Sequence, residues 1–274
     1  MDFVETTEEC DLILVGLPVN KGTEKEGCDE APSKIREYFD NFFFSESANN
    51  NRILDKGDIT EENNFDTTMS KIYEKMIEYF KFNKPIITLG GNHSITFPII
   101  RALSRFHEKI GVIHIDAHPD CQIDYLPYGD VIGSIKQIDE VKKIIMLGLR
   151  NWSKYEYNYL KEEKIPFIDM NSFMEAGIDY CLKKIKDYVS DCDAIYVTFD
   201  IDAIDPAYAP GTGWKEPGGI TSRDAIKIVQ NLAKLPTIKG FDLVEVNPSL
   251  DQNDITSILA AKIVFEFADN LGTK

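Results

Sequence analysis

The segment Asp193-Ala-Ile-Tyr-Val-Thr-Phe199 is the clearest strand in the sequence. Its apolar and β-branched side chains follow one another without the polar alternation of a half-exposed strand, so the pattern predicts burial on both faces. Strands of this kind are typical of parallel sheets that are covered by helices. Similar runs predict further strands at residues 11–16, 85–89, 112–115, 143–147, 166–168 and 238–244.

Helical segments alternate with these strands. They are expected at residues 31–43, 94–106, 155–164, 172–188, 222–233 and 254–267. The alternation predicts an α/β fold with a central, mostly parallel sheet between two helical layers. No internal repeat or Pro/Ser-rich linker divides the chain, so residues 1–274 are expected to form a single domain. The Asn-rich, charged segment 45–64 is expected to be an exposed excursion.

The composition narrows the range of partners and compartments. Thirty Lys and Arg residues against forty-six Asp and Glu residues give a formal net charge of −16, which argues against nucleic acid or an anionic membrane as partner. The N-terminus lacks the basic and then apolar order of a signal peptide, and no apolar run approaches the ~20 residues of a membrane span. The five cysteines are scattered without a C-x-x-C pair, so reduced thiols and a cytoplasmic location are expected.

Ionisable residues follow four of the predicted strands directly. The motifs are Gly90-Gly-Asn-His-Ser94, Asp116-Ala-His-Pro-Asp120, Asp200-Ile-Asp-Ala-Ile-Asp-Pro206 and Glu245-Val-Asn-Pro248. Ligands of doubly wound parallel sheets bind just beyond the carboxyl ends of the strands. The four motifs are therefore expected to meet at one edge of the sheet.

So many carboxylates cannot converge without positive charge, because an unpaired buried carboxylate is costly and several together repel one another. One or two bound cations would resolve this. Mixed Asp and His ligands suit Mn²⁺, Fe²⁺, Co²⁺ or Zn²⁺, and the absence of Cys argues against a structural zinc site. Two neighbouring ions can activate water at neutral pH, which is hydrolytic chemistry.

Some ionisable residues are expected to have other roles. His114 lies inside a strand and is expected to be a buried supporting residue rather than a ligand. His107 is expected on the surface, and Asp205, which precedes a proline, is expected to stabilise a turn. Asp242 is expected to be structural.

Over nearly its whole length the sequence resembles the ureohydrolase family of arginases, agmatinases and formimidoylglutamases. Besides the four motifs, the resemblance rests on Val15-Gly-Leu-Pro18, Gly27-Cys-Asp-Glu-Ala-Pro-Ser-Lys-Ile-Arg36 and Thr256-Ser-Ile-Leu-Ala-Ala-Lys262. The segments Ala209–Gly213 and Glu216–Thr221 are similar to the agmatinase branch rather than to true arginases.

This resemblance implies a three-layer, arginase-like α/β/α fold with two Mn²⁺ ions per subunit, in a homo-oligomer (a trimer or hexamer). It implies that one ion is bound by His93, Asp116, Asp120 and Asp200, and the other by Asp116, His118, Asp200 and Asp202. A metal-bridging hydroxide would attack a guanidinium or amidine carbon, and Asp120 would also act in catalysis by hydrogen bonding that hydroxide. Glu245 would pair with the substrate's guanidinium.

The sequence departs from the family pattern at two places. Asn92 stands where the family mostly has Asp. The segment Tyr128–Ser134 aligns with a family loop that ends in His-Gly, and the histidine position falls on Ile132, which cannot transfer a proton. Asp130 and Tyr128 are nearby candidates for that role. Gln122, Tyr128 and Ser153 fall where polar contacts with the substrate are expected.

The expected function is that of an agmatinase-like hydrolase, which converts a small cationic guanidino compound, agmatine, and water to putrescine and urea. One alternative keeps the chemistry but changes the substrate to formimidoylglutamate or a guanidino acid. Another is a metal-binding relative with weak or no catalysis, because of Ile132.

Overall fold

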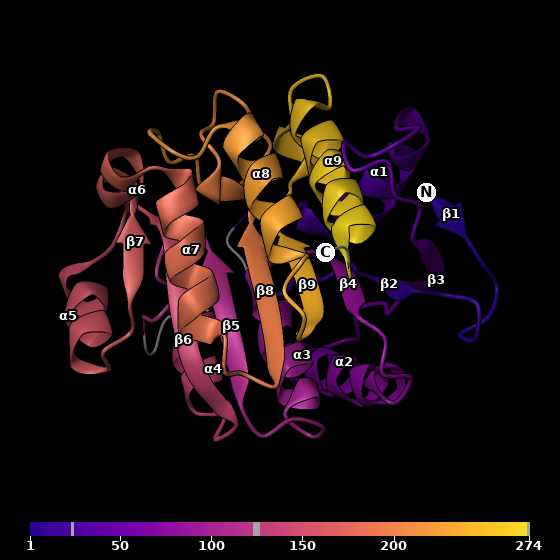
Figure 1. Ribbon diagram of the computed structural model, residues 1–274, viewed down its shortest axis with the longest axis horizontal. Helices are drawn as coiled ribbons and strands as arrows, with labels where there is room; N and C mark the ends of the chain where they lie inside the picture. The colour runs from indigo at the N-terminus through magenta and orange to yellow at the C-terminus, as the bar shows by residue number, and fades with distance from the viewer. Residues whose placement is uncertain (23–24, 123–126, 273–274) are drawn as a thin grey trace.

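The computed structural model describes residues 1–22, 25–122 and 127–272, with the backbone alone at Pro127 and Tyr128. Its centre is a nine-stranded sheet with the strand order β1-β3-β2-β4-β9-β8-β5-β6-β7, and every neighbouring pair is parallel (Figure 1). The predicted α/β fold is therefore confirmed. The strands are β1 (Asp2–Phe3), β2 (Leu12–Leu17), β3 (Arg52–Asp58), β4 (Ile86–Gly90), β5 (Ile110–Ile115), β6 (Val141–Leu149), β7 (Phe167–Asp169), β8 (Ala194–Asp200) and β9 (Ile238–Val244).

Helices cover both faces of the sheet. One layer contains α1 (Ala31–Glu37), α6 (Met170–Ala176), α7 (Ile178–Val189), α8 (Ser222–Leu232) and α9 (Ile255–Asn270). The other contains α2 (Phe65–Phe80), α3 (Thr96–Leu103), α4 (Val131–Lys136) and α5 (Lys154–Glu162). In the view of Figure 1 the first layer lies in front of the sheet. The three-layer prediction is confirmed.

Strand β8 shows why its sequence is apolar throughout. Val197 and Phe199 pack in the core of the first helical layer, whereas Ala194 and Tyr196 pack in the core of the second. Asp242 on β9 is fully buried, and its carboxylate accepts hydrogen bonds from the hydroxyls of Tyr196 (2.7 Å) and Thr96 (2.9 Å). The structural role predicted for Asp242 is therefore confirmed.

The prediction for segment 45–64 was wrong in part, because the segment contains β3. This strand pairs with β1 and β2, yet only Ile53 and Leu54 on it are buried, so it has no apolar run. Two of its charged residues are held by Arg36 of α1, whose guanidinium contacts Asp55 at 2.8 Å and Asp58 at 2.7 Å.

Other differences concern the helices. The sequence analysis predicted neither α2 nor α4. The single helix expected over 172–188 is two helices, which are separated at Gly177, where φ is +79°. Glycine adopts this backbone conformation without a steric penalty, and the chain changes direction there.

Among the described residues, no helix is long and apolar enough to cross a membrane.

The packing of β9 against α9 gives a test of the core. Phe241 is fully buried, and its ring stacks on Phe267 with 4.2 Å between centroids. Replacing Phe241 with alanine should lower the free energy of unfolding by about 3–5 kcal/mol, because it leaves a cavity. Urea unfolding measures the change, and Phe43→Ala, at an 88% exposed side chain, should change it by no more than about 0.5 kcal/mol. Equal effects of the two substitutions would contradict the packing.

Candidate active site

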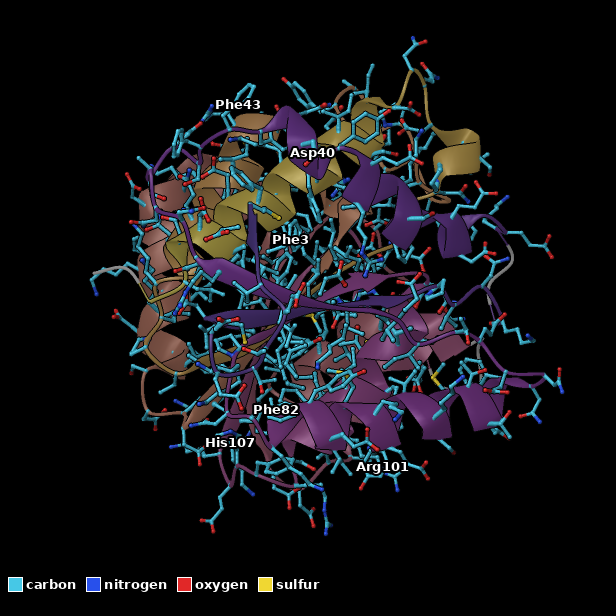
Figure 2. The ribbon with its side chains drawn as sticks, turned by 90° about the vertical axis from the view of Figure 1, so that its right-hand side faces the viewer. Phe3, Asp40, Phe43, Phe82, Arg101 and His107 are labelled. Atoms are coloured by element: carbon cyan, nitrogen blue, oxygen red, sulfur yellow. The ribbon has the colours of Figure 1, made fainter. Side chains whose placement is uncertain are left out.

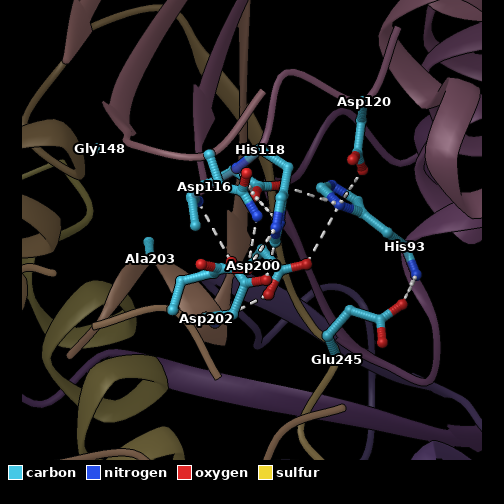
Figure 3. A network of polar contacts seen from close by, with 12 residues as sticks. His93, Asp116, His118, Asp120, Gly148, Asp200, Asp202, Ala203 and Glu245 are labelled. Atoms are coloured by element: carbon cyan, nitrogen blue, oxygen red, sulfur yellow. Dashed lines mark hydrogen bonds and ion pairs between the residues drawn. The ribbon is translucent and has the colours of Figure 1, made fainter. Parts of the chain in front are cut away.

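The four motifs meet at the carboxyl edge of the sheet, as predicted. They follow β4, β5, β8 and β9, which are neighbours in the order β4-β9-β8-β5. His93 lies in a short 3₁₀ helix just after β4, Asp116 follows β5, and Asp200 ends β8. Glu245 follows β9. Figure 3 shows their side chains converging on one region.

The imidazole of His93 is surrounded by carboxylates. Its Nδ1 atom lies 3.0 Å from Asp120 Oδ2, 3.2 Å from Asp116 Oδ2 and 3.4 Å from Asp200 Oδ2. His114 stacks on His93, with ring centroids 5.3 Å apart, and its Nε2 atom lies 3.2 Å from Asp116 Oδ2. His114 is fully buried, as predicted, and its imidazole contacts the carboxylate of Asp116.

A second group forms around His118. Its Nδ1 atom lies 3.0 Å from Asp202 Oδ2 and 3.5 Å from Asp116 Oδ1, so Asp116 belongs to both groups. Backbone N–H groups fix these carboxylates: His118 donates to Asp116 (2.6 Å), Asp202 donates to Asp200 (2.8 Å), and Ala117 donates to Asp202 (3.2 Å). The backbone of these loops thus orients the carboxylates.

The pKa values of this region reflect the crowding. Burial raises the pKa of Asp200 well above its usual value, and the neighbouring Asp202 and Asp116 raise it further. Burial opposes protonation of His93, but contacts with three carboxylates outweigh it and raise the pKa of that imidazole. The pKa of His118 is raised in the same way by Asp202 and Asp116.

Metal ions explain the packing of these imidazole and carboxylate groups better than hydrogen bonds between them do. His93 Nδ1 and Asp116 Oδ2 are buried, and neither has a partner with hydrogen-bond geometry. One imidazole nitrogen carries at most one proton, so it cannot satisfy three carboxylates. Within the described residues, two sets of closely spaced ligand atoms stand out: His93, His114, Asp116 and Asp120; and Asp116, His118 and Asp202.

Glu245 lies beside this region and is 5% exposed. Its Oε1 atom accepts a hydrogen bond from the backbone N–H of His93 at 2.7 Å, and its Oε2 atom lies 3.7 Å from the thiol of Cys28, which donates to it. Burial raises the pKa of Glu245 to about 7. Both Glu245 and Asp120 have a left-handed backbone, with φ of +62° and +47°, a strained conformation that is common at functional sites.

A cavity of about 390 Å³ opens above these groups. Gln122 and Ser153 line it, and their contacts with a substrate stay a prediction, whereas the side chain of Tyr128 lies outside the described residues. The sequence analysis missed the lining side chains that lie just after β6, in α5 and in the loop before α8. These are Asn151, Trp152, Glu156 and Trp214.

The structure places Ile132 away from the cavity. Its side chain is fully buried in the core beside α3, and its backbone N–H donates to the carbonyl oxygen of Asp120 at 2.8 Å. The carboxylate of Asp130 lies against Gly133, where an added Cβ would be 2.1 Å from Oδ1, so Asp130 does not line the cavity either. On this backbone, a side chain at position 132 points into the core and not toward the four motifs.

Three further polar residues named in the sequence analysis do not line the cavity. The amide of Asn92 donates to the carbonyl of Lys21 at 2.9 Å, which a carboxylate could not do. Asp205 accepts hydrogen bonds from the backbone of Ala207, Gly218 and Gly219, so the turn predicted there is confirmed. His107 is partly exposed, near the amino end of β5 (Figure 2).

The profile of the arginase family matches residues 10–268. The chain belongs to the arginase family. It is 30% identical to the agmatinase of Enterobacter sp. (strain 638) over 284 residues, which cover 97% of this chain and 89% of the relative. Among solved structures, the formimidoylglutamase of Bacillus subtilis is similar with a TM-score of 0.90, 25% identity and coverage of 96% and 87% of the two chains. Proclavaminate amidino hydrolase of Streptomyces clavuligerus gives a TM-score of 0.88, 26% identity and coverage of 96% and 92%.

Membership of the arginase family makes this protein an amidinohydrolase that acts on linear C–N bonds. The family implies a binuclear metal site, and this chain has two His/Asp groups whose ligand atoms lie close together. The resemblance noted in the sequence and the arginase-like fold are confirmed.

Asp200, which is expected to be a ligand of both ions, gives a direct test of metal binding. Asp200→Ala should abolish the binding of Mn²⁺ by the purified protein, because this carboxylate is expected to contact both ions. Metal content after dialysis measures the loss. Asp205→Asn is the matched control on the same loop and should retain its metal. Bound metal retained by Asp200→Ala would contradict the ligand assignment.

Proton release gives a second test. Neighbouring carboxylates raise the pKa of His93 and His118, and burial and neighbouring carboxylates raise that of Asp200, so these groups hold their protons to higher pH in the metal-free protein than they ordinarily would. Metal ligands must lose their protons, so Mn²⁺ affinity should rise with pH, by up to about tenfold per pH unit for each proton released. Calorimetry in buffers of different ionisation enthalpy measures the number of protons. Binding without proton release between about pH 6 and 8 would contradict these pKa directions.

Proposed function

We propose that this protein is a binuclear manganese hydrolase of agmatine, which it converts with water to putrescine and urea. The observation that carries the proposal is the lining of the cavity. Aspartate, glutamate, histidine and tryptophan side chains surround it, and no lysine or arginine is among the described lining residues. This environment favours a substrate that is positively charged at both ends.

We propose His93, Asp116, Asp120 and Asp200 as ligands of one ion, and Asp116, His118, Asp200 and Asp202 as ligands of the other. Once ionised, the four aspartates carry the negative charge that two divalent cations neutralise. Bound Mn²⁺ would supply Lewis-acid activation of water and electrostatic stabilisation of the tetrahedral centre. The support from this chain is the buried, unpartnered set of nitrogen and oxygen atoms around His93.

Glu245 is proposed to bind the guanidinium of the substrate. The N–H of His93 and the thiol of Cys28 hold its two oxygens, so the carboxylate is fixed before a substrate arrives. A planar guanidinium donates parallel hydrogen bonds to such a carboxylate and keeps it ionised. Asp120, which lines the cavity and contacts His93, is proposed to hold the proton of the attacking water.

A second candidate substrate is a guanidino acid or formimidoylglutamate. One observation favours it: the ammonium of Lys25 lies 5.7 Å from the centre of the Trp214 ring, and Trp214 lines the cavity. A carboxylate at the distal end of a substrate could pair with that ammonium.

We further infer a homo-oligomer, a trimer or hexamer, from the resemblance to the family. A cytoplasmic location is proposed because all five cysteines are free and buried.

A matched pair of substrates tests the proposal. Agmatine and 4-guanidinobutanoate have the same guanidino end and differ in the charge of the other end. With the Mn²⁺-loaded protein, kcat/KM for urea release should be at least about tenfold higher for agmatine, about 1.4 kcal/mol. A preference for 4-guanidinobutanoate that Lys25→Ala removes would support the second candidate. Two bound metals without urea from either compound, and no turnover of formimidoylglutamate, would overturn the proposed activity and favour the weakly catalytic alternative.

The role of Glu245 is tested by Glu245→Gln, which keeps an oxygen to accept the His93 N–H but removes the charge. Its kcat/KM for agmatine should fall by about 10- to 150-fold, because a hydrogen bond to a charged group contributes roughly 1.5–3 kcal/mol. Steady-state kinetics at saturating Mn²⁺ measure the fall, and the bound metal should stay at the level of the unmodified protein. An unchanged kcat/KM would exclude Glu245 as the guanidinium partner.

A further inference from the structure

The imidazole of His118 has a different partner on each nitrogen. Nδ1 faces Asp202 and Asp116, at 3.0 Å and 3.5 Å. Nε2 lies on the other side of the ring, 3.3 Å from Oε1 of Glu216. No strand-end motif contains Glu216, and it is not among the side chains that line the cavity. Its contact with His118 therefore needs another explanation than binding a substrate.

Glu216 is held in place from two sides. The side-chain amide of Asn151 donates to the same Oε1 atom at 2.7 Å. The guanidinium of Arg150 donates to the backbone carbonyl of Glu216 through Nε (3.1 Å) and Nη2 (2.6 Å). Both the carboxylate and the backbone of Glu216 are thus fixed by the segment that follows β6.

Arg150 also ties this loop to the chain that follows β8. Its Nη2 donates to the carbonyl of Asp202 at 2.6 Å, and its Nη1 donates to the carbonyl of Ala203 at 3.2 Å. Gly219 allows the close approach, because a Cβ there would lie 2.7 Å from Arg150 Nη2 and 2.7 Å from the carbonyl oxygen of Ala203. Glu216 and Asp202 are therefore held by one guanidinium, on opposite sides of the His118 ring.

We propose that Glu216 is a positioning residue for His118. Its carboxylate accepts a hydrogen bond from the Nε2–H group of His118. This contact fixes the tautomer of the ring and turns the lone pair of Nδ1 toward Asp116 and Asp202. A carboxylate behind a ligating imidazole orients the ring and makes it a stronger ligand, and loss of such a partner typically costs about 10- to 100-fold in metal affinity or activity. The effect should be confined to the ion beside His118, because the four proposed ligands of the other ion do not contact Glu216 in any described interaction.

This inference rests on the metal-binding part of the proposed function and not on the substrate. It is tested by titrating the metal-free protein with Mn²⁺ and measuring the two dissociation constants by calorimetry and by electron paramagnetic resonance. Glu216→Ala should weaken the binding of one ion by about 10- to 100-fold and leave the other within about twofold. Glu216→Gln keeps an oxygen that accepts from Asn151 and His118, and its effect should be smaller.

Two measurements separate positioning from a loss of structure. The thermal midpoint of the metal-free Glu216→Ala protein should stay within about 2 °C of the unmodified protein, because a partly exposed side chain is removed. Glu108→Ala is the control: it removes an exposed carboxylate just before β5, at the opposite edge of the sheet, and should leave both dissociation constants unchanged.

Unchanged affinities of both ions in Glu216→Ala, or equal weakening of both, would overturn the role of Glu216. Failure to hydrolyse agmatine would not, because the titration uses Mn²⁺ alone. If instead the unmodified protein bound no Mn²⁺, the metal centre of the proposed function would fail, and this inference with it.

Discussion

One electrostatic constraint governs the site: carboxylates that are buried together require positive charge close by. Asp116, Asp200 and Asp202 are each no more than 3% exposed and lie at the carboxyl ends of neighbouring strands. Burial and mutual repulsion raise the pKa of Asp200 and Asp202. Burial acts on Asp116 in the same direction, but the surrounding imidazoles outweigh it and lower its pKa. The binuclear metal site that the arginase family implies would supply this positive charge.

The rest of the fold serves to hold these groups before any ion or substrate is bound. The central strands are apolar on both faces and packed between two helical layers, so their ends cannot shift independently. Backbone N–H groups orient the carboxylates, and the left-handed conformations of Asp120 and Glu245 direct both side chains to the same region. Preorganisation of this kind avoids a reorganisation cost when charge develops during catalysis.

Much of this was predictable because the signals were local. Buried strands have continuous apolar runs, and residues directly after parallel strands meet at one edge, so the four motifs identified the site. β3 was missed because only Ile53 and Leu54 on it are buried. Trp152, Trp214 and Glu216 were not predicted as site residues because they lie on loops, and the tertiary fold alone brings such residues together. The expectation of a single domain stays a prediction.

The side chain of Ile132 lies in the core, so this position does not supply a group to the cavity. The resemblance to the family led us to expect a histidine there, but the side chain of Ile132 belongs to the core and its backbone N–H donates to the carbonyl of Asp120. Any proton transfer must therefore use groups that face the cavity. In the proposed metal centre two divalent ions would offset the four aspartates, and Glu245 and Glu156 would remain as further carboxyl groups of the cavity lining. A dication with a guanidinium and an ammonium would complement such a lining, whereas the carboxylate of a guanidino acid would need a cation to pair with, such as Lys25 beside Trp214. The choice between the two substrate classes thus depends on the balance of charge around the cavity rather than on the metal centre they share.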